Sequence, residues 1–384
     1  MKYNIQFISS YGKIHEYNFI KEILPDSKID IYSDTGYANF ASDTVENYYK
    51  CHEITAFIAK SYESIRFSFI RRFLNLVSAI ALILSSRRKD YDYCVIHFLS
   101  KRRAILSCLL PKKRKTILLT YGSDILRNNK LNSFFYRTMF DRAYKIVEIS
   151  GNIQYKLGKV FQNKYKEKSV FIPFPYASFG ILDHLLKNTS REDARAFFNL
   201  PQDKYVVVCG HTSTHDEQFE KLIPVLSSCS DSVLDGIHFV FPMTYGNGDY
   251  KEYREKIKQM LLSSKLHYTV LEEYMSYNDM VNLHIASDIH ITTITTDALS
   301  FFLLEELYCG SILLYGSWLH YMELEFGKTN SISFESFEDL PQIIQTLFDN
   351  HLERKVNRVD EQNYIKKIQS PESIKNSWDT VLNP

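Results

Sequence analysis

Two carboxylates in the second half of the chain have a spacing that could serve chemistry. Asp297 and Glu305 are separated by seven residues, and Gly310 follows five positions after Glu305. Leucine and phenylalanine recur behind Asp297 at helical spacing, so we expect a helix that begins near Asp297 and ends at Gly310. The free N–H groups and the dipole of a helix start favour a phosphate. Glu305, two turns into this largely apolar helix, would need a polar partner.

The segments around this helix predict the scaffold that positions it. Apolar runs at 287–292 and 311–315 indicate buried strands before and after the helix, which is a strand-helix-strand unit of a parallel sheet. Similar runs, separated mostly by helical patterns, occur at 3–8, 28–32, 93–98, 115–120, 144–149, 169–172, 204–210, 237–243 and 266–271. This alternation predicts an α/β fold with doubly wound parallel sheets, whose ligands bind at the carboxyl ends of the strands.

The Asp297–Glu305–Gly310 pattern resembles the donor-site signature of GT-B glycosyltransferases. The resemblance implies two Rossmann-like, doubly wound parallel-sheet domains that face each other across a cleft, with a C-terminal helix that crosses back to the first domain. It also implies that Glu305 holds the ribose hydroxyls of a nucleotide and that Asp297 contacts the sugar to be transferred. The family has Glu where this chain has Asp297, which shortens the reach. The alternative is an ordinary crossover helix with Asp297 as a solvated cap and Glu305 on its outer face together with Glu306.

Two loops extend the resemblance over roughly residues 204–327. Gly210 precedes His-Thr-Ser-Thr, and a later loop has Pro-Met-Thr-Tyr-Gly, an order similar to the 4-acetamidofucosyl transferase family of enterobacterial common antigen synthesis. The resemblance implies that the Gly210 loop faces the diphosphate or the sugar of the donor and that Tyr245 lies beside the nucleotide. The hydroxyl donors of the loop would be Thr212, Ser213 and Thr214. Loops rich in Ser and Thr are also ordinary turns and helix caps.

Two cations lie near the second loop. Lys251 and Arg254 follow it in sequence and are the nearest candidates to neutralise a leaving diphosphate. Backbone N–H groups and helix starts can stabilise that charge without a metal. The Asp90-Tyr-Asp92 segment precedes a strand instead of ending one, so we expect a turn there and no metal site.

The first half of the chain offers candidates for a general base. Asp124 follows a predicted strand in a Gly-Ser-Asp turn, which resembles a Gly-x-Asp turn in the acceptor domain of many GT-B enzymes. A carboxylate there can accept the proton of an acceptor hydroxyl, or it can simply cap the next helix. His15, just after the loop that ends at Gly12, and His97, at the end of a strand, are further candidates. The glycine permits close backbone approach to a ligand.

Pro173 and Pro175 mark a domain boundary, because neither strand nor helix continues through two such closely spaced prolines. We expect an acceptor-binding domain at 1–175, a donor-binding domain at 176–360, and C-terminal helices at 361–384 that return to the first domain. The last of these helices has apolar residues at helical spacing that would pack against the first domain: Ile374, Trp378 and Val381.

Residues 61–115 form a strongly basic region. They contain 13 Lys and Arg and three acids, a balance of +10 in a chain of net charge +1. The apolar run at 73–84 is shorter than the roughly 20 residues that span a bilayer. The cations beside this run include Arg71, Arg72, Arg87 and Arg88. We expect a face that docks on anionic lipid; the alternative is a buried crossover helix with solvated ends.

The composition narrows the classes of function. A net charge of +1 does not indicate nucleic-acid binding, and the six scattered cysteines predict reduced core residues of a cytoplasmic protein. The chain opens directly into a predicted strand, so we expect no signal peptide. Because the basic region is expected to dock on anionic lipid, we expect a location on the inner face of the plasma membrane.

The resemblance and the basic region together suggest one activity. We expect a cofactor-free, metal-independent glycosyltransferase that moves a sugar from a nucleotide-diphosphate sugar to a polyprenyl-diphosphate-linked saccharide in bacterial surface-polysaccharide synthesis. A nucleotide-sugar 2-epimerase of the same fold and a non-catalytic scaffold subunit of a polysaccharide complex are the alternatives.

Overall fold

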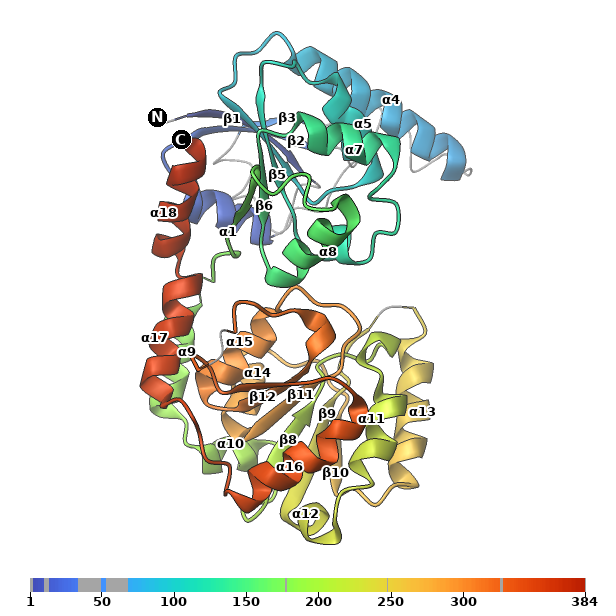
Figure 1. The fold of residues 1–384 in the computed structure, drawn as a ribbon, viewed down its shortest axis with the longest axis vertical. Coiled ribbons are helices and arrows are strands. Elements are labelled where there is room, and N and C mark those ends of the chain that lie inside the picture. Colours follow the sequence, from blue (N-terminus) through green and yellow to red (C-terminus); the bar gives the residue numbers. More distant parts are fainter. Residues whose placement is uncertain are drawn as a thin grey trace. The chain divides into compact units, whose positions relative to one another are not determined.

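The computed structural model describes residues 3–9, 14–33, 50–52, 68–176, 178–246, 248–324 and 327–383. The chain divides into two compact units (Figure 1). The first unit combines Met1–Pro175 with Gln369–Pro384, and the second contains Tyr176–Ile368. The division at Pro175 lies within the proline segment that the sequence indicates as a boundary.

The described residues of the first unit form a seven-stranded parallel sheet in the order β3-β2-β1-β4-β5-β6-β7. Its strands are β1 (Asn4–Ser9), β2 (Lys28–Ser33), β3 (Lys50–His52), β4 (Tyr93–His97), β5 (Lys115–Leu119), β6 (Lys145–Glu148) and β7 (Ser169–Phe171). The order reverses between β1 and β4, which makes the carboxyl ends of these two strands the topological switch point of the sheet.

Helices pack around this sheet. They are α1 (Ile14–Ile23), α4 (Ser68–Ser86), α5 (Lys101–Leu109), α6 (Ser123–Leu126), α7 (Phe134–Arg142), α8 (Gly151–Phe161) and the C-terminal α18 (Pro371–Leu382). Trp378 of α18 is buried, and its ring packs edge-on at 5.1 Å from that of Phe19 in α1. The hydroxyl of Tyr93 donates to the carbonyl of Leu382. These contacts confirm that the C-terminal helix returns to the first unit.

The second unit contains a six-stranded parallel sheet in the order β10-β9-β8-β11-β12-β13, counted over its described residues. The strands are β8 (Tyr205–Cys209), β9 (Ile237–Pro242), β10 (Tyr268–Leu271), β11 (Ile289–Thr292), β12 (Ile312–Gly316) and β13 (Ser331–Phe334). Here the order reverses between β8 and β11, which again defines a doubly wound sheet with a switch point.

Helices cover both faces of the second sheet (Figure 1). The helical elements are α9 (Phe179–Asn188), α10 (Arg191–Phe197), η1 (His215–Glu217), α11 (Phe219–Leu226), α12 (Asp231–Gly236), α13 (Tyr250–Leu262), α14 (Tyr277–Ala286), α15 (Phe301–Cys309), η2 (Ser317–Leu319), η3 (Phe337–Asp339), α16 (Leu340–Asp349) and α17 (Arg358–Gln369). Val207 belongs to the core on one face, and Val206 and Val208 belong to the core on the other. Both faces are therefore buried, as continuous apolar strands require.

Two boundaries differ from the sequence-based expectation. The return to the first unit starts at Gln369 and not at residue 361, because Ile365 of α17 is buried in the core of the second unit. Helix α15 starts at Phe301 and not near Asp297, because Ser300 is extended and Leu299 has a φ of 57°. Glu305 therefore lies about one turn into the helix instead of two.

Candidate functional site

The loops that follow β8 and β11 meet at the switch point of the second sheet. In open α/β sheets this is the place where ligands bind. Gly210 begins the β8 loop with a φ of 63°, and a Cβ atom there would lie 2.7 Å from Glu217 Oε2 and 2.8 Å from the ring of Phe219. A side chain at this position would be strained and would clash, so the tight turn requires glycine.

Glu217 in η1 connects these loops, and the sequence analysis did not single it out. Its buried Oε1 accepts hydrogen bonds from the backbone N–H of His211 at 3.2 Å and from the backbone N–H and hydroxyl of Thr212 at 3.0 and 2.8 Å. The carbonyl of Glu217 accepts from the hydroxyl of Thr293, in the β11 loop, at 2.5 Å. Its only sequence signal is an acid placed shortly after a loop rich in Ser and Thr.

The hydroxyl residues of the β8 loop mostly bond within the second unit. Thr212 and Thr214 share a hydrogen bond of 3.0 Å between their hydroxyls, while Ser213 donates from its backbone N–H to Tyr245 O at 2.7 Å and from its hydroxyl to Tyr250 O at 3.0 Å. A Cβ at Gly246 would lie 2.6 Å from Ser213 O, so glycine lets the β9 loop approach this closely. The side chain of Tyr245 is half exposed beside the β8 loop. Contact of these residues with a donor stays a prediction.

Asp297 is held in the β11 loop. Its Oδ2 accepts from the backbone N–H of Ser300 at 2.7 Å and from the hydroxyl of Tyr321 at 2.8 Å. Burial, together with the charge of Asp297, raises the pKa of Tyr321 well above its ordinary value, so this tyrosine stays a neutral donor. Asp297 thus precedes the start of α15 and fixes the loop that leads into it.

Glu305 is buried, with 2% of its surface exposed, and is surrounded by donors. It accepts from the hydroxyls of Tyr176 and Tyr277 (the latter at 3.3 Å), and its Oε2 lies 3.1 Å from His284 Nε2. The carboxylate has the polar partners that its apolar surroundings demand. Neither Glu305 nor the fully buried Glu306 lies on an outer face of the helix, which removes that alternative.

His284 joins both glutamates in the core of the second unit. Its Nδ1 lies 3.0 Å from Glu306 Oε1, and His290 Nδ1 lies 3.5 Å from the same oxygen. Burial alone would lower the pKa of His284, but the charges of Glu306 and Glu305 and their hydrogen bonds raise it to about 9. Burial would likewise raise the pKa of Glu306, yet His284 and His290 lower it to about 2. The arrangement places the buried ring of His284 between two buried acids, Glu305 and Glu306.

The cations predicted near the second loop differ in their environment. The guanidinium of Arg254 forms an ion pair with Glu272 at 3.2 Å and donates to the carbonyls of Met243 and Glu272 at 3.3 Å. Lys251 is exposed on α13 and has no ion-pair partner among the described residues. Lys251 therefore has the freer charge of the two.

Asp124 in the first unit is buried and bonded on both oxygens. Its Oδ2 accepts from the backbone N–H of Leu99 at 2.7 Å, and its Oδ1 accepts from those of Tyr121 and Gly122 at 3.0 and 2.8 Å. Burial raises the pKa of Asp124, and the three backbone bonds and nearby His97 oppose that rise. The carboxylate joins the loops after β4 and β5. This geometry favours the structural alternative over a role as base.

The histidines lie at the switch point of the first sheet. His97 ends β4, is buried, and packs against the rings of Tyr121 at 5.2 Å and Phe7 at 6.0 Å. His15 is in the first turn of α1, after β1, but its side chain lies outside the described residues, as does Gly12. The chain thus places both histidines where ligands bind in such sheets.

The described residues contain neither a metal-binding cluster nor a membrane-spanning helix. No group of three or more His, Cys, Asp or Glu in the ranges given above is placed to hold a metal ion. Among the helices of those ranges, none has both the length and the apolar character that a membrane crossing needs.

Comparison with solved structures identifies the fold. A glycosyltransferase from Rickettsia africae matches with a TM-score of 0.67 and 13% identity, covering 99% of this chain and 98% of the other. HepE from Anabaena, in complex with UDP, matches with a TM-score of 0.69 and 16% identity over 99% of both chains. Sucrose-phosphate synthase from Thermosynechococcus elongatus matches with a TM-score of 0.68 and 11% identity over 98% of both.

The chain has the GT-B fold. Its two doubly wound parallel sheets, with the C-terminal helix in the first unit, match these structures over nearly their whole length. No family model matches the sequence, and no curated protein matches it.

Proposed function

We propose that this GT-B protein is a glycosyltransferase that moves a sugar from a nucleotide-diphosphate sugar to a hydroxyl of a polyprenyl-diphosphate-linked saccharide in bacterial surface-polysaccharide synthesis. The observation that carries the proposal is the similarity over both units to HepE, whose structures contain UDP and UDP-glucose. The Asp297–Glu305–Gly310 spacing and the β8 loop support it from the sequence side.

In this proposal the second unit binds the donor at the β8–β11 switch point. Tyr245 offers an exposed aromatic face next to the β8 loop, and the start of α15 offers N–H groups for a phosphate. Lys251, which is exposed on α13 and forms no ion pair among the described residues, is the cation we propose for the leaving diphosphate. The ribose hydroxyls would have to replace the hydroxyl of Tyr176 or Tyr277 to reach Glu305, since both already donate to it.

The proposed base comes from the switch point of the first sheet. Transfer requires a group that accepts the proton of the acceptor hydroxyl. Asp124 is committed to three backbone N–H groups, which leaves His15 and His97 as the better candidates. His15 lies in the first turn of α1, the first described helix after β1, and is the one we propose to test first.

Helix α4 supports a membrane-bound acceptor. Its exposed apolar residues recur every four positions, with Phe69 75%, Phe73 58% and Val77 46% exposed. Arg87 and Arg88 follow the helix and are exposed, whereas the side chains of Arg71 and Arg72 lie outside the described residues. An exposed apolar stripe beside cations is typical of a helix that lies in the interface of an anionic membrane. We propose that the face formed by α4 and the two arginines docks on the lipid that holds the acceptor.

A titration with nucleoside diphosphates and their sugars tests donor binding. We expect at least one nucleoside diphosphate to bind and to raise the midpoint of thermal unfolding, because a ligand of the folded state stabilises it by mass action. Tyr245→Ala should weaken that binding by about 0.5–1.5 kcal/mol, the range for aromatic contacts beyond their buried area. Phe197→Ala, which removes an exposed ring from α10, is the matched control and should leave binding unchanged.

One observation favours a second candidate, a non-catalytic scaffold. Glu305 and the donors of Thr212 already have partners within the second unit, as they would in a protein that has lost nucleotide binding. Failure of every nucleoside diphosphate to bind would favour the scaffold over the transferase.

A further inference from the structure

A cavity of about 920 Å³ lies in the second unit, away from the switch point. The loop before β13, the segment before α17 and α17 itself line it, through residues that include Lys328, Arg354, Lys355 and Lys367. Lys328 precedes the first residue of β13, so the cavity lies at the amino-terminal edge of the sheet. Because all strands of this sheet are parallel, the cavity and the switch point lie at opposite edges.

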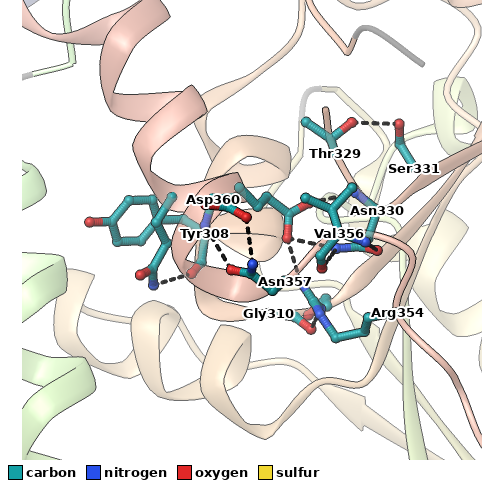
Figure 2. A network of polar contacts seen from close by, with 12 residues as sticks. Tyr308, Gly310, Thr329, Asn330, Ser331, Arg354, Val356, Asn357 and Asp360 are labelled. Atoms are coloured by element: carbon teal, nitrogen blue, oxygen red, sulfur yellow. Dashed lines mark hydrogen bonds and ion pairs between the residues drawn. The ribbon is translucent and has the colours of Figure 1, made fainter. Parts of the chain in front are cut away.

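Asn330 links the segment before α17, which lines the cavity, to the start of β13 (Figure 2). Asn330 donates from Nδ2 to the carbonyl of Val356 at 2.8 Å, and the N–H of Val356 donates back to Asn330 Oδ1 at 3.0 Å. The backbone N–H and Nδ2 of Asn330 also donate to the buried Glu361 at 2.6 and 3.0 Å. These bonds hold the segment before α17 against the residues that precede β13. The cavity is therefore formed before any ligand arrives.

Of the two acids at this cavity, Glu361 and Asp360, one forms an ion pair. Glu361 pairs with the guanidinium of Arg354, which also donates to the carbonyl of Gly310. Asp360 accepts from the side chain of Asn357 at the start of α17. Figure 2 shows the contacts of Arg354 with Gly310 and of Asn357 with Asp360. Arg354 thus balances the charge of Glu361, whereas the neutral amide of Asn357 leaves Asp360 as one negative charge in a lining with three further cations, all lysines.

Three lysines of the lining outnumber the single carboxylate there. Lys328, Lys355 and Lys367 line the cavity and are exposed, and none has an ion-pair partner in the part of the chain that the structure describes. Four cations and one carboxylate thus line a volume of the size that small-molecule sites have. Three ammonium groups around one hollow repel one another, and a multiply charged anion removes that repulsion.

From this arrangement we propose that the cavity at the amino-terminal edge of the second sheet binds a ligand with more than one phosphoryl charge, at a site separate from the donor site. Lysine ammonium groups on flexible stems suit phosphoryl oxygens, because each is a compact charge with three donors. The framework of Arg354, Glu361 and Asn330 keeps the cavity open when it is empty. The proposal does not depend on the transferase activity.

Titration with inorganic diphosphate tests the proposal. The test variant is Lys328→Gln/Lys355→Gln/Lys367→Gln, and the matched control is Lys166→Gln/Lys187→Gln/Lys265→Gln, which removes the same charge from exposed lysines elsewhere. We expect the wild type and the control to bind diphosphate equally, and the test variant to bind it about tenfold or more weakly. Tyr245→Ala should leave this binding unchanged, because Tyr245 follows a strand at the opposite edge.

Vesicles distinguish a free phosphate from a lipid headgroup. Loss of diphosphate binding in the test variant assigns the site to a free phosphorylated molecule. The site takes a phosphorylated headgroup if the wild type does not bind diphosphate but does bind vesicles with phosphatidic acid. In that case the test variant should no longer bind those vesicles. If the test variant binds both probes as the wild type does, the proposal is wrong. Equal thermal unfolding midpoints of the two triple variants would show that folding does not explain the loss.

Discussion

At the scale of single residues, the backbone hydrogen bonds of Asp124 favour a structural role over the predicted role as general base. Both of its oxygens accept from backbone N–H groups. In Asp124→Asn one oxygen becomes an NH₂ group that faces a donor, so we expect the free energy of unfolding to fall by about 1.5–3 kcal/mol. Urea denaturation measures this, with exposed Asp26→Asn as the control. A variant of normal stability with turnover reduced about 100-fold or more would restore Asp124 as the base.

The buried His284–Glu306 pair predicts a pH dependence of stability. The pKa of His284 is raised from 6.5 to about 9, so its contribution is complete below pH 6.5 and is lost as pH rises to about 9. The pKa of Glu306 is lowered from 4.5 to about 2, so its contribution is complete above pH 4.5 and is lost as pH falls to about 2. The pair therefore stabilises the fold most between pH 4.5 and 6.5.

Urea denaturation across pH tests this residue pair. Between pH 6.5 and 9 we expect the free energy of unfolding to fall by at most about 1.4 kcal/mol per pH unit, the limit for one proton. The double variant His284→Gln/Glu306→Gln should flatten this slope, whereas exposed His184→Gln should not. An unchanged slope in the double variant would show that the pair does not carry a charge.

Sequence reasoning at this scale found some site residues and missed others, for a physical reason. Glu305 stood out because a carboxylate in an apolar helix needs partners, and the structure supplies them from Tyr176, Tyr277 and His284. Those partners lie in other elements, so no local pattern could name them. Glu217 escaped notice because its importance comes from backbone N–H groups of a loop, which carry no sequence signature.

At the scale of elements, most strands and the two doubly wound sheets follow from apolar periodicity and its alternation with helices. The start of α15 could not be predicted correctly, because the helical spacing of its leucines continues to positions before its first turn. The N–H of Ser300 and the hydroxyl of Tyr321 hold Asp297 in a loop instead. Tyr321 is 24 positions away. A long-range contact thus overrides a local helical pattern.

The exposed apolar residues of helix α4 predict binding to membranes. We expect the protein to bind vesicles that contain anionic lipid and to dissociate as salt rises, because surface attraction is screened within about 8 Å at physiological ionic strength. Phe69→Ser/Phe73→Ser/Val77→Ser should weaken binding at least about tenfold, since each side chain loses apolar area that the interface would bury. Vesicle sedimentation measures both effects.

The control for α4 removes exposed apolar side chains elsewhere. Ile181→Ser/Phe197→Ser/Leu262→Ser changes residues of comparable exposure in the second unit and should leave vesicle binding intact. Equal loss in both variants, or equal binding to neutral and anionic vesicles, would mean that α4 is not the docking surface.

At the scale of the whole molecule, the proposed function gives each of the two units its own task. The first unit carries His15, His97 and the exposed stripe of α4, which suit an acceptor at a membrane. The second unit carries Tyr245, Asp297 and Glu305, which suit a nucleotide sugar. The fold was predictable because strands and helices alternate regularly along the chain. The identity of the sugar and of the acceptor depends on individual side chains, which no periodic pattern predicts.

Transfer of a labelled sugar tests the central claim most directly. The protein would be incubated with labelled nucleotide sugars and a polyprenyl-diphosphate saccharide, and the label in the lipid phase would be counted together with the nucleoside diphosphate released. We expect label to enter the lipid phase with one nucleoside diphosphate released for each sugar, and His15→Ala to reduce that rate by about 100- to 10,000-fold with the fold intact. Binding of a nucleotide sugar without any acceptor-dependent release of the nucleoside diphosphate would contradict the account.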